Sequence, residues 1–118
     1  MDGGCIFCKI VRGEVPCEKI YENENFIAIL DINPYVEGHS LLISKKHFET
    51  ALDLPLSLGA ELLDCIKKTS LKLIEKFKAE GFNIIQSNYP VAQQEVPHVH
   101  FHILPRKKGD GELKFVKK

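Results

Sequence analysis

Three of the five histidines in this 118-residue chain stand at alternate positions of one short segment, VPHVHFHILPR. Successive side chains of a β-strand point to opposite faces of its sheet. An extended conformation therefore places His98, His100 and His102 on one face, while the apolar residues between them can enter a core. Such a row is typical of a metal site, a catalytic site, or a site that combines both. A chance cluster on a wet strand is the less favoured alternative, because the row is embedded in an apolar run.

Length and composition indicate one globular domain spanning residues 1–118. Sixteen basic and sixteen acidic residues give a formal net charge of zero, which argues against a nucleic-acid-binding surface. No apolar run approaches the roughly 18 residues of a membrane helix, and the N-terminal MDGGCIFCK lacks the apolar region of a signal peptide. We therefore expect a cytoplasmic protein with no membrane partner. Residues from about 107 to 118 form a basic C-terminal tail, which we expect to be a solvated terminus.

The hydrophobic pattern predicts five strands and one long helix. Residues 18–23 and 25–32 are typical of two strands around a polar turn, residues 39–44 of a third and residues 82–87 of a fourth, with the histidine row as the fifth. From Pro55 to about Glu80 apolar residues recur at helical spacings, and Gly81 suits the helix C-terminal end. This order predicts an α+β fold with a mostly antiparallel sheet. The helix would cover one face, leaving the other for the histidines.

The four cysteines indicate metal binding more than disulfide bonding. Without a secretion signal, a disulfide framework is disfavoured, while Cys5 and Cys8 form a Cys-x-x-Cys pair. A structural zinc needs four ligands, so these two thiolates require two imidazoles from His39, His47 or the histidine row. The alternative is a pair of reduced thiols beside a surface histidine. The residues alone leave both interpretations open.

The same histidine row fits nucleophilic catalysis at phosphorus. A neutral imidazole is available at pH 7 because its pKa is about 6.5. It can accept a phosphoryl or nucleotidyl group and release it again, which divides one transfer into two steps. Neighbouring imidazoles can stabilise charge that develops on the phosphate oxygens. The pattern therefore favours phosphoryl-transfer chemistry as much as metal binding.

At these residues the sequence resembles the histidine-triad (HIT) family. HVHFHIL matches the motif His-φ-His-φ-His-φ-φ, where φ is apolar, without a mismatch. CIFCKIVRGEVP resembles the N-terminus of the family, and AILDINPYVEGHSLLISKKHF resembles its nucleotide-binding loop and the strand after it. The resemblance covers nearly the whole chain and is strongest to the short branch of nucleotide-binding proteins and hydrolases. It implies a HIT-like fold with a five-stranded sheet, one long helix, a short N-terminal helix and a homodimeric assembly.

The resemblance also implies roles for individual residues. His100 corresponds to the nucleophile that attacks the α-phosphorus and carries a covalent nucleotidyl intermediate. His102 and His39 correspond to histidines that contact the phosphate, and Asp31 to the acid that binds the ribose hydroxyls. Ile32 would line the base pocket together with neighbours such as Phe7, Ile10 and Ile29. One structural zinc per chain is implied, bound by Cys5, Cys8, His47 and His98.

The segment QSNYPVAQQEVPH departs from the family pattern. Tyr89 and Gln93 stand where members often have glycine, which permits positive φ and close approach to phosphate. The usual phosphate-loop geometry is therefore in doubt. Glu95 stands where several members have Ser or Thr; it is either an acid for the leaving group or a charged residue at the strand edge. The expected substrate-binding residues are Asp31, Ile32, Ser87, Asn88, Gln94 and Glu95.

The function implied is a hydrolase of the nucleoside phosphoramidase type, which cleaves purine nucleotides at the α-phosphate. Two alternatives stay open. One is a dinucleoside polyphosphate hydrolase, and the other is a nucleotide-binding signalling module without turnover. The intact His100 argues against the second, because binding alone does not require a nucleophile. The physiological substrate and base preference do not follow from the residues.

Overall fold

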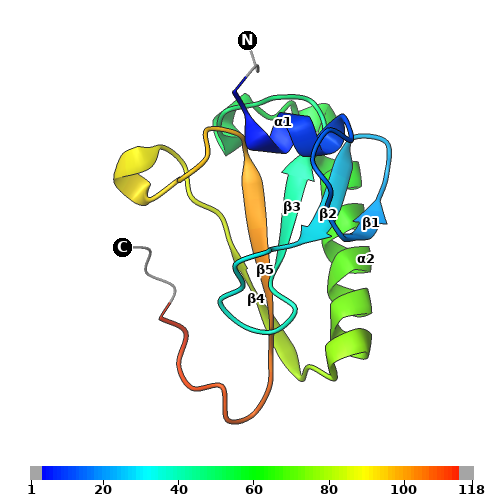
Figure 1. Cartoon of the computed structure of the whole chain (residues 1–118), viewed down its shortest axis with the longest axis vertical. Coiled ribbons are helices and arrows are strands. Elements are labelled where there is room, and N and C mark those ends of the chain that lie inside the picture. The colour runs from blue at the N-terminus through cyan, green and yellow to red at the C-terminus, as the bar shows by residue number, and fades with distance from the viewer. Residues whose placement is uncertain (1–3, 115–118) are drawn as a thin grey trace.

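The computed structural model describes residues 4–114, and its centre is a five-stranded antiparallel sheet (Figure 1). The strand order is β1-β2-β3-β5-β4, so the last strand lies between the third and the fourth. This arrangement confirms the predicted α+β class. The strands are β1 (Lys19–Glu22), β2 (Phe26–Leu30), β3 (Ser40–Ser44), β4 (Gly81–Ile85) and β5 (His100–Arg106).

The long helix α2 (Gly59–Phe77) runs along one face of the sheet (Figure 1). Its buried residues Cys65 and Leu73 pack on Phe26, Leu42 and Ile103 from three central strands. Each large apolar side chain buried in this way contributes about 1.5–3 kcal/mol relative to exposure. Within residues 4–114, no helix combines the length and apolar character needed to cross a membrane.

The observed bounds of α2 differ from the predicted ones at both ends. Two short 3-10 turns, Ala51–Asp53 and Leu56–Leu58, precede the helix. At the other end Lys78 adopts the left-handed conformation, with φ of 56°, while the N–H of Ala79 bonds to the carbonyl of Ile74. The predicted end at Gly81 is therefore wrong, because a non-glycine residue makes the turn and Gly81 begins β4.

The short helix α1 (Ile6–Val11) covers part of the opposite face, where a second apolar cluster includes Phe7 and Ile43. The register of β3 against β5 pairs Ile43 with His100 and Leu41 with His102. Paired residues share a face, so both histidines lie on the α1 side of the sheet. Phe101 is paired with Leu42 and packs toward α2. The predicted division of this strand into a histidine face and a core face is thus observed, although His98 lies just before β5.

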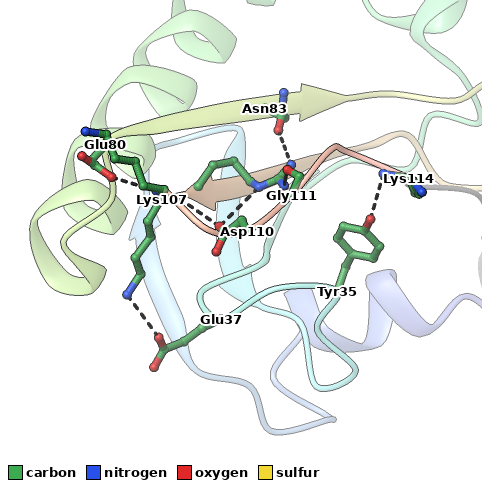
Figure 2. Close-up of polar contacts among 10 residues, drawn as sticks. Tyr35, Glu37, Glu80, Asn83, Lys107, Asp110, Gly111 and Lys114 are labelled. Atoms are coloured by element: carbon green, nitrogen blue, oxygen red, sulfur yellow. Dashed lines mark hydrogen bonds and ion pairs between the residues drawn. The ribbon is translucent and has the colours of Figure 1, made fainter.

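The described part of the basic tail turns back onto the domain (Figure 2). The Asp110 carboxylate accepts a hydrogen bond from the N–H of Lys107 at 2.9 Å, and the N–H of Lys114 donates to the Tyr35 hydroxyl at 2.8 Å. The Lys107 ammonium also lies 3.8 Å from the carboxylate of Glu37. Residues 107–114 therefore contact the loop between β2 and β3. Residues 115–118 of the predicted tail lie outside the described residues.

Candidate functional site

His100 lies at the start of β5, and a backbone carbonyl fixes the orientation of its ring. Its Nδ1 lies 2.8 Å from the carbonyl oxygen of His98, so Nδ1–H donates to that oxygen and Nε2 carries the lone pair. The ring is buried and packs edge-on against Phe7, with 5.0 Å between centroids. Burial lowers the pKa of His100, and the His98 carbonyl and the charges of Glu95 and Asp31 only partly oppose this effect.

The neighbouring histidines form a chain of hydrogen bonds whose proton positions follow from one backbone donor. The N–H of Tyr35 donates to Nδ1 of His39 at 2.9 Å, so the ring proton of neutral His39 lies on Nε2. That nitrogen is 3.0 Å from Nδ1 of His102 and 3.5 Å from the carboxylate of Asp31. His102 therefore accepts at Nδ1 and carries its own proton on Nε2, where it can donate to a phosphate oxygen.

A metal ion is a poor ligand for the group formed by Asp31, His39 and His102. The ligand atoms of Asp31, His39 and His102 all lie within 4.8 Å of one another. A metal on Nε2 of His39 would move the ring proton to Nδ1. There it would face the N–H of Tyr35, and two donors would oppose each other. These three residues therefore fit a hydrogen-bonded group better than a metal site.

A cavity of about 320 Å³ lies beside His100 and His102 and is lined by both apolar and polar side chains. Ile32 lines it despite being 96% exposed, which places this residue at the mouth. Cys17, an exposed free thiol, also lines this mouth, and no sequence signal pointed to it. The apolar lining includes Ile6, Phe7, Ile10, Ile29 and Leu41, and the polar lining includes Asp31, Glu95, His100 and His102.

Three of the expected substrate-binding residues do not line this cavity. The amide oxygen of Asn88 accepts from the N–H of Ala51 at 2.8 Å, and Ser87 precedes it in the same loop. Gln94 is only 6% exposed and connects two backbone groups: its Oε1 accepts from the N–H of Tyr89, and its Nε2 donates to the carbonyl of Glu49. In this structure Asn88 and Gln94 shape the loop, and substrate contact by any of the three stays a prediction.

Tyr89 and Gln93 keep a glycine-like backbone without being glycine. Their φ values are 73° and 72°, and Lys78 is the only other described non-glycine residue with positive φ. The sequence left the geometry of the phosphate loop in doubt because neither residue is glycine. The backbone at both positions nevertheless takes conformations that glycine adopts freely. The side chain of Tyr89 points to solvent and does not line the cavity.

Cys5, Cys8, His47 and His98 come together as the sequence predicted. Cys5 Sγ lies 3.2 Å and Cys8 Sγ 3.5 Å from His98 Nδ1, and Cys8 Sγ lies 3.2 Å from His47 Nδ1. Sulfur and nitrogen ligands of a tetrahedral zinc are separated by about 3.6 Å, so the donor set fits. Nε2 of His98 lies 2.8 Å from the carbonyl of Ser44, which leaves Nδ1 unprotonated to bind a metal. The four residues can hold a metal ion that links α1 to the segment that leads into β5.

Known proteins share this fold and sequence. Residues 12–109 match the HIT domain, so the chain belongs to the HIT family. An uncharacterised HIT-like protein of Methanocaldococcus jannaschii is 47% identical over 109 residues, which span 92% of this chain and 84% of that protein. An adenosine 5′-monophosphoramidase of Saccharomyces cerevisiae is 39% identical, over 91% of this chain and 65% of the yeast protein. An adenylylsulfatase of Arabidopsis thaliana is also 39% identical, over 93% of this chain and 56% of that longer protein.

A solved structure adds a metal-bound example. The Zn-bound histidine triad family protein of Mycobacterium smegmatis superposes with a TM-score of 0.87 at 37% identity, covering 100% of this chain and 85% of that one. This likeness confirms the predicted fold.

Proposed function

We propose that this chain hydrolyses purine nucleoside 5′-phosphoramidates at the α-phosphate through a nucleotidyl intermediate on His100. The observation that carries the proposal is the hydrogen bond from Nδ1 of His100 to the His98 carbonyl. It leaves the lone pair on Nε2 of a ring that lines the same cavity as Asp31. The similarity to the yeast monophosphoramidase, at 39% identity, supports the same class of reaction.

The proposed chemistry has two displacements at phosphorus. Nε2 of His100 forms a bond to the α-phosphorus while the bond from phosphorus to the leaving amine breaks, and the amine takes a proton from solvent as it leaves. Water then attacks the same phosphorus and gives a proton to solvent, the phosphorus–His100 bond breaks, and the nucleoside monophosphate is released. The Nε2–H of His102 donates to a phosphate oxygen in both steps, which stabilises the charge that develops there.

The charges around the cavity favour an amine over a polyphosphate as leaving group. Polyphosphate substrates are usually bound by Lys, Arg or Mg²⁺. The described residues that line this cavity include no Lys or Arg, while Asp31 and Glu95 are acidic. A dinucleoside polyphosphate hydrolase is therefore the second candidate. A pure binding module is the third, and it leaves the buried, oriented His100 without a purpose.

Mass spectrometry tests the nucleophile directly. After brief mixing with adenosine 5′-phosphoramidate at neutral pH, the wild-type protein should carry one adenylyl group and release AMP. His100→Ala should show neither while still binding AMP, which checks that the variant is folded. Binding without adduct or turnover in the wild type would overturn the proposal.

We further propose that the ion held by the Cys5, Cys8, His47 and His98 set is zinc and that its role is structural. Two thiolates and two imidazoles fill a tetrahedral site with protein ligands, so no position is left to activate water. The similarity to the Zn-bound Mycobacterium smegmatis protein supports the choice of metal. Metal analysis of the purified protein should give about one zinc per chain, and Cys8→Ser should lower this content.

A homodimer is the assembly we propose. The edge strand β4 exposes Phe82 and Ile84, at 41% and 45% of their surface, on the α2 side of the sheet, where they pair with Pro105 and Ile103. Apolar residues on an open strand edge are typical of an interface. Light scattering should give twice the chain mass, and Ile84→Lys should shift it toward the monomer.

A further inference from the structure

A second cavity of about 590 Å³ adjoins the cavity beside His100. The two cavities share Ile6, Glu95 and Val96 as common walls, so they meet at Glu95. In the proposed function the base lies against the apolar lining residues, such as Ile10 and Ile29, and the ribose lies at Asp31. This places the α-phosphate at His100. Its leaving group then projects toward Glu95, because the nucleoside fills the other direction. The second cavity is therefore the space into which a leaving group extends.

A second carboxylate, that of Glu49, also lines this space. The buried amide of Gln94 fixes this arrangement, since it donates to the carbonyl of Glu49 at 2.6 Å and immediately precedes Glu95. The N–H of Val99 donates to the carbonyl of Phe48 at 2.7 Å, which holds the same two segments together. The two glutamates thus share one cavity because the segments that carry them are hydrogen-bonded to each other.

The charge in this space is negative. The remaining lining residues are apolar or belong to the metal-binding set, and none of the described lining residues is Lys or Arg. His47 and Cys5 direct their donor atoms toward that set rather than toward a leaving group. A cationic leaving group would be attracted by both carboxylates, and an anionic one would be repelled.

We propose that Glu49 and Glu95 make the enzyme selective for nucleotide conjugates whose leaving amine carries a second, cationic group. The inference rests on the proposed function and names its substrate class: diamines and amines of the lysine type are favoured, and carboxylate- or phosphate-bearing leaving groups are disfavoured. Each glutamate is solvent-accessible, and exposed charge pairs are worth about 0.2–1 kcal/mol. Each carboxylate therefore changes selectivity by about 1.4- to fivefold.

Three AMP conjugates of matched length test this selectivity. The P–N linked amine is butane-1,4-diamine, butylamine or 4-aminobutanoate, and kcat/KM is measured for each with the metal-loaded protein. The ratio of the cationic to the anionic conjugate is compared among wild type, Glu49→Gln, Glu95→Gln and the double variant. Glu75→Gln is the matched control, because Glu75 is exposed on α2 and lines neither cavity. A ratio is used because Glu95→Gln can also alter the rate with every substrate.

We expect the wild type to prefer the cationic conjugate and each glutamine variant to lower the ratio by about 1.4- to fivefold. The preference should also shrink as NaCl screens the carboxylates. A ratio that is equal in the wild type and the double variant overturns the inference, while hydrolysis of the butylamine conjugate preserves the proposed function. If no conjugate is hydrolysed, the proposed function fails. The dissociation constants of the three conjugates for His100→Ala, with and without the glutamine substitutions, then decide the charge preference separately.

Discussion

His98 serves two parts of the site through different atoms. Its Nδ1 belongs to the metal-binding set, while its backbone carbonyl accepts the Nδ1–H of His100. The carbonyl of Ser44 fixes the ring of His98 from the other side. A metal bound at His98 would therefore restrict the motion of the same backbone that orients the His100 ring. The alternation of the triad explains why His98 has both contacts, since His98 stands two positions before His100 and supplies the carbonyl that His100 contacts.

The lowered pKa of His100 predicts that activity persists into mildly acidic solution. The neutral ring is the nucleophile in the proposed reaction, and burial disfavours its protonated form. The acid limb of kcat/KM against pH should therefore fall below the ordinary imidazole pKa of about 6.5. Because acid can also release a metal from thiolates, zinc content is measured at each pH. An acid limb above pH 6.5 with the metal retained would contradict the assignment.

The backbone of Tyr89 stores strain that glycine would relieve. Tyr89 has φ of 73° and ψ of 152°, a region that is almost restricted to glycine. We expect Tyr89→Gly to raise the free energy of unfolding by about 1 kcal/mol, because the relieved strain exceeds the entropy cost of glycine. Urea denaturation measures the change. Tyr89→Ala keeps the strain, so it should give no gain; equal stability of the glycine and alanine variants would contradict the explanation.

At the scale of elements, one carboxylate ties the β1–β2 hairpin to α2. Asp64 accepts hydrogen bonds from the Tyr21 hydroxyl at 2.6 Å and from the Asn23 amide at 3.1 Å, and it pairs with Lys68. The Tyr21 and Asn23 hydrogen bonds are the leading causes that lower the pKa of Asp64 to about 2. The connection holds the helix on the sheet from its outer edge.

Removal of this charge should matter above the unfolded pKa and not below the folded one. A carboxyl whose folded pKa is depressed contributes stability above its unfolded pKa of about 3.9, and this is lost as pH falls through the folded value. Asp64→Asn should therefore be less stable than the wild type at pH 7, and the difference should shrink between about pH 4 and pH 2. Thermal melts across this range measure it. A difference that does not depend on pH would show that shape, not charge, is responsible.

The sequence predicted the elements better than it predicted their ends and connections. Hydrophobic periodicity located the five strands and α2, because alternation and helical spacing follow directly from which face is buried. The end of α2 at Lys78 was missed, since left-handed turns at non-glycine residues leave no residue-type signal. Gln94 was expected to bind substrate, but its amide reaches the backbone of Glu49, 45 residues earlier. Such a long-range hydrogen bond cannot be read from local pattern.

At the scale of the whole molecule, the N-terminal helix α1 contacts the domain through Cys5, Phe7 and Cys8. Cys5 and Cys8 flank Phe7, which packs on His100 and closes the cavity from the α1 side. The helix has only six residues, too few to be stable alone. Its position therefore depends on these contacts and on any metal bound there.

Removal of the metal should loosen α1 and lower global stability. A ligand at a hundred times its dissociation constant stabilises the native state by about 3 kcal/mol, so chelation should lower the free energy of unfolding by at least this amount. Hydrogen exchange should accelerate at the amides of α1 and less in α2, which serves as an internal control. Restoration of zinc should reverse both effects. Unchanged exchange in α1 after verified metal loss would contradict the structural role.

The exposed thiol of Cys17 lies at the mouth of the cavity where the base is expected to bind. Cys65, by contrast, belongs to α2 and is buried against the sheet. Burial raises the pKa of its thiol to about 11, so the thiol is unreactive at neutral pH. The pocket thus offers a built-in anchor for covalent capture. A nucleoside analogue that carries a mild electrophile on its purine edge would become tethered at Cys17, which gives chemists a way to lock the enzyme without touching its histidines.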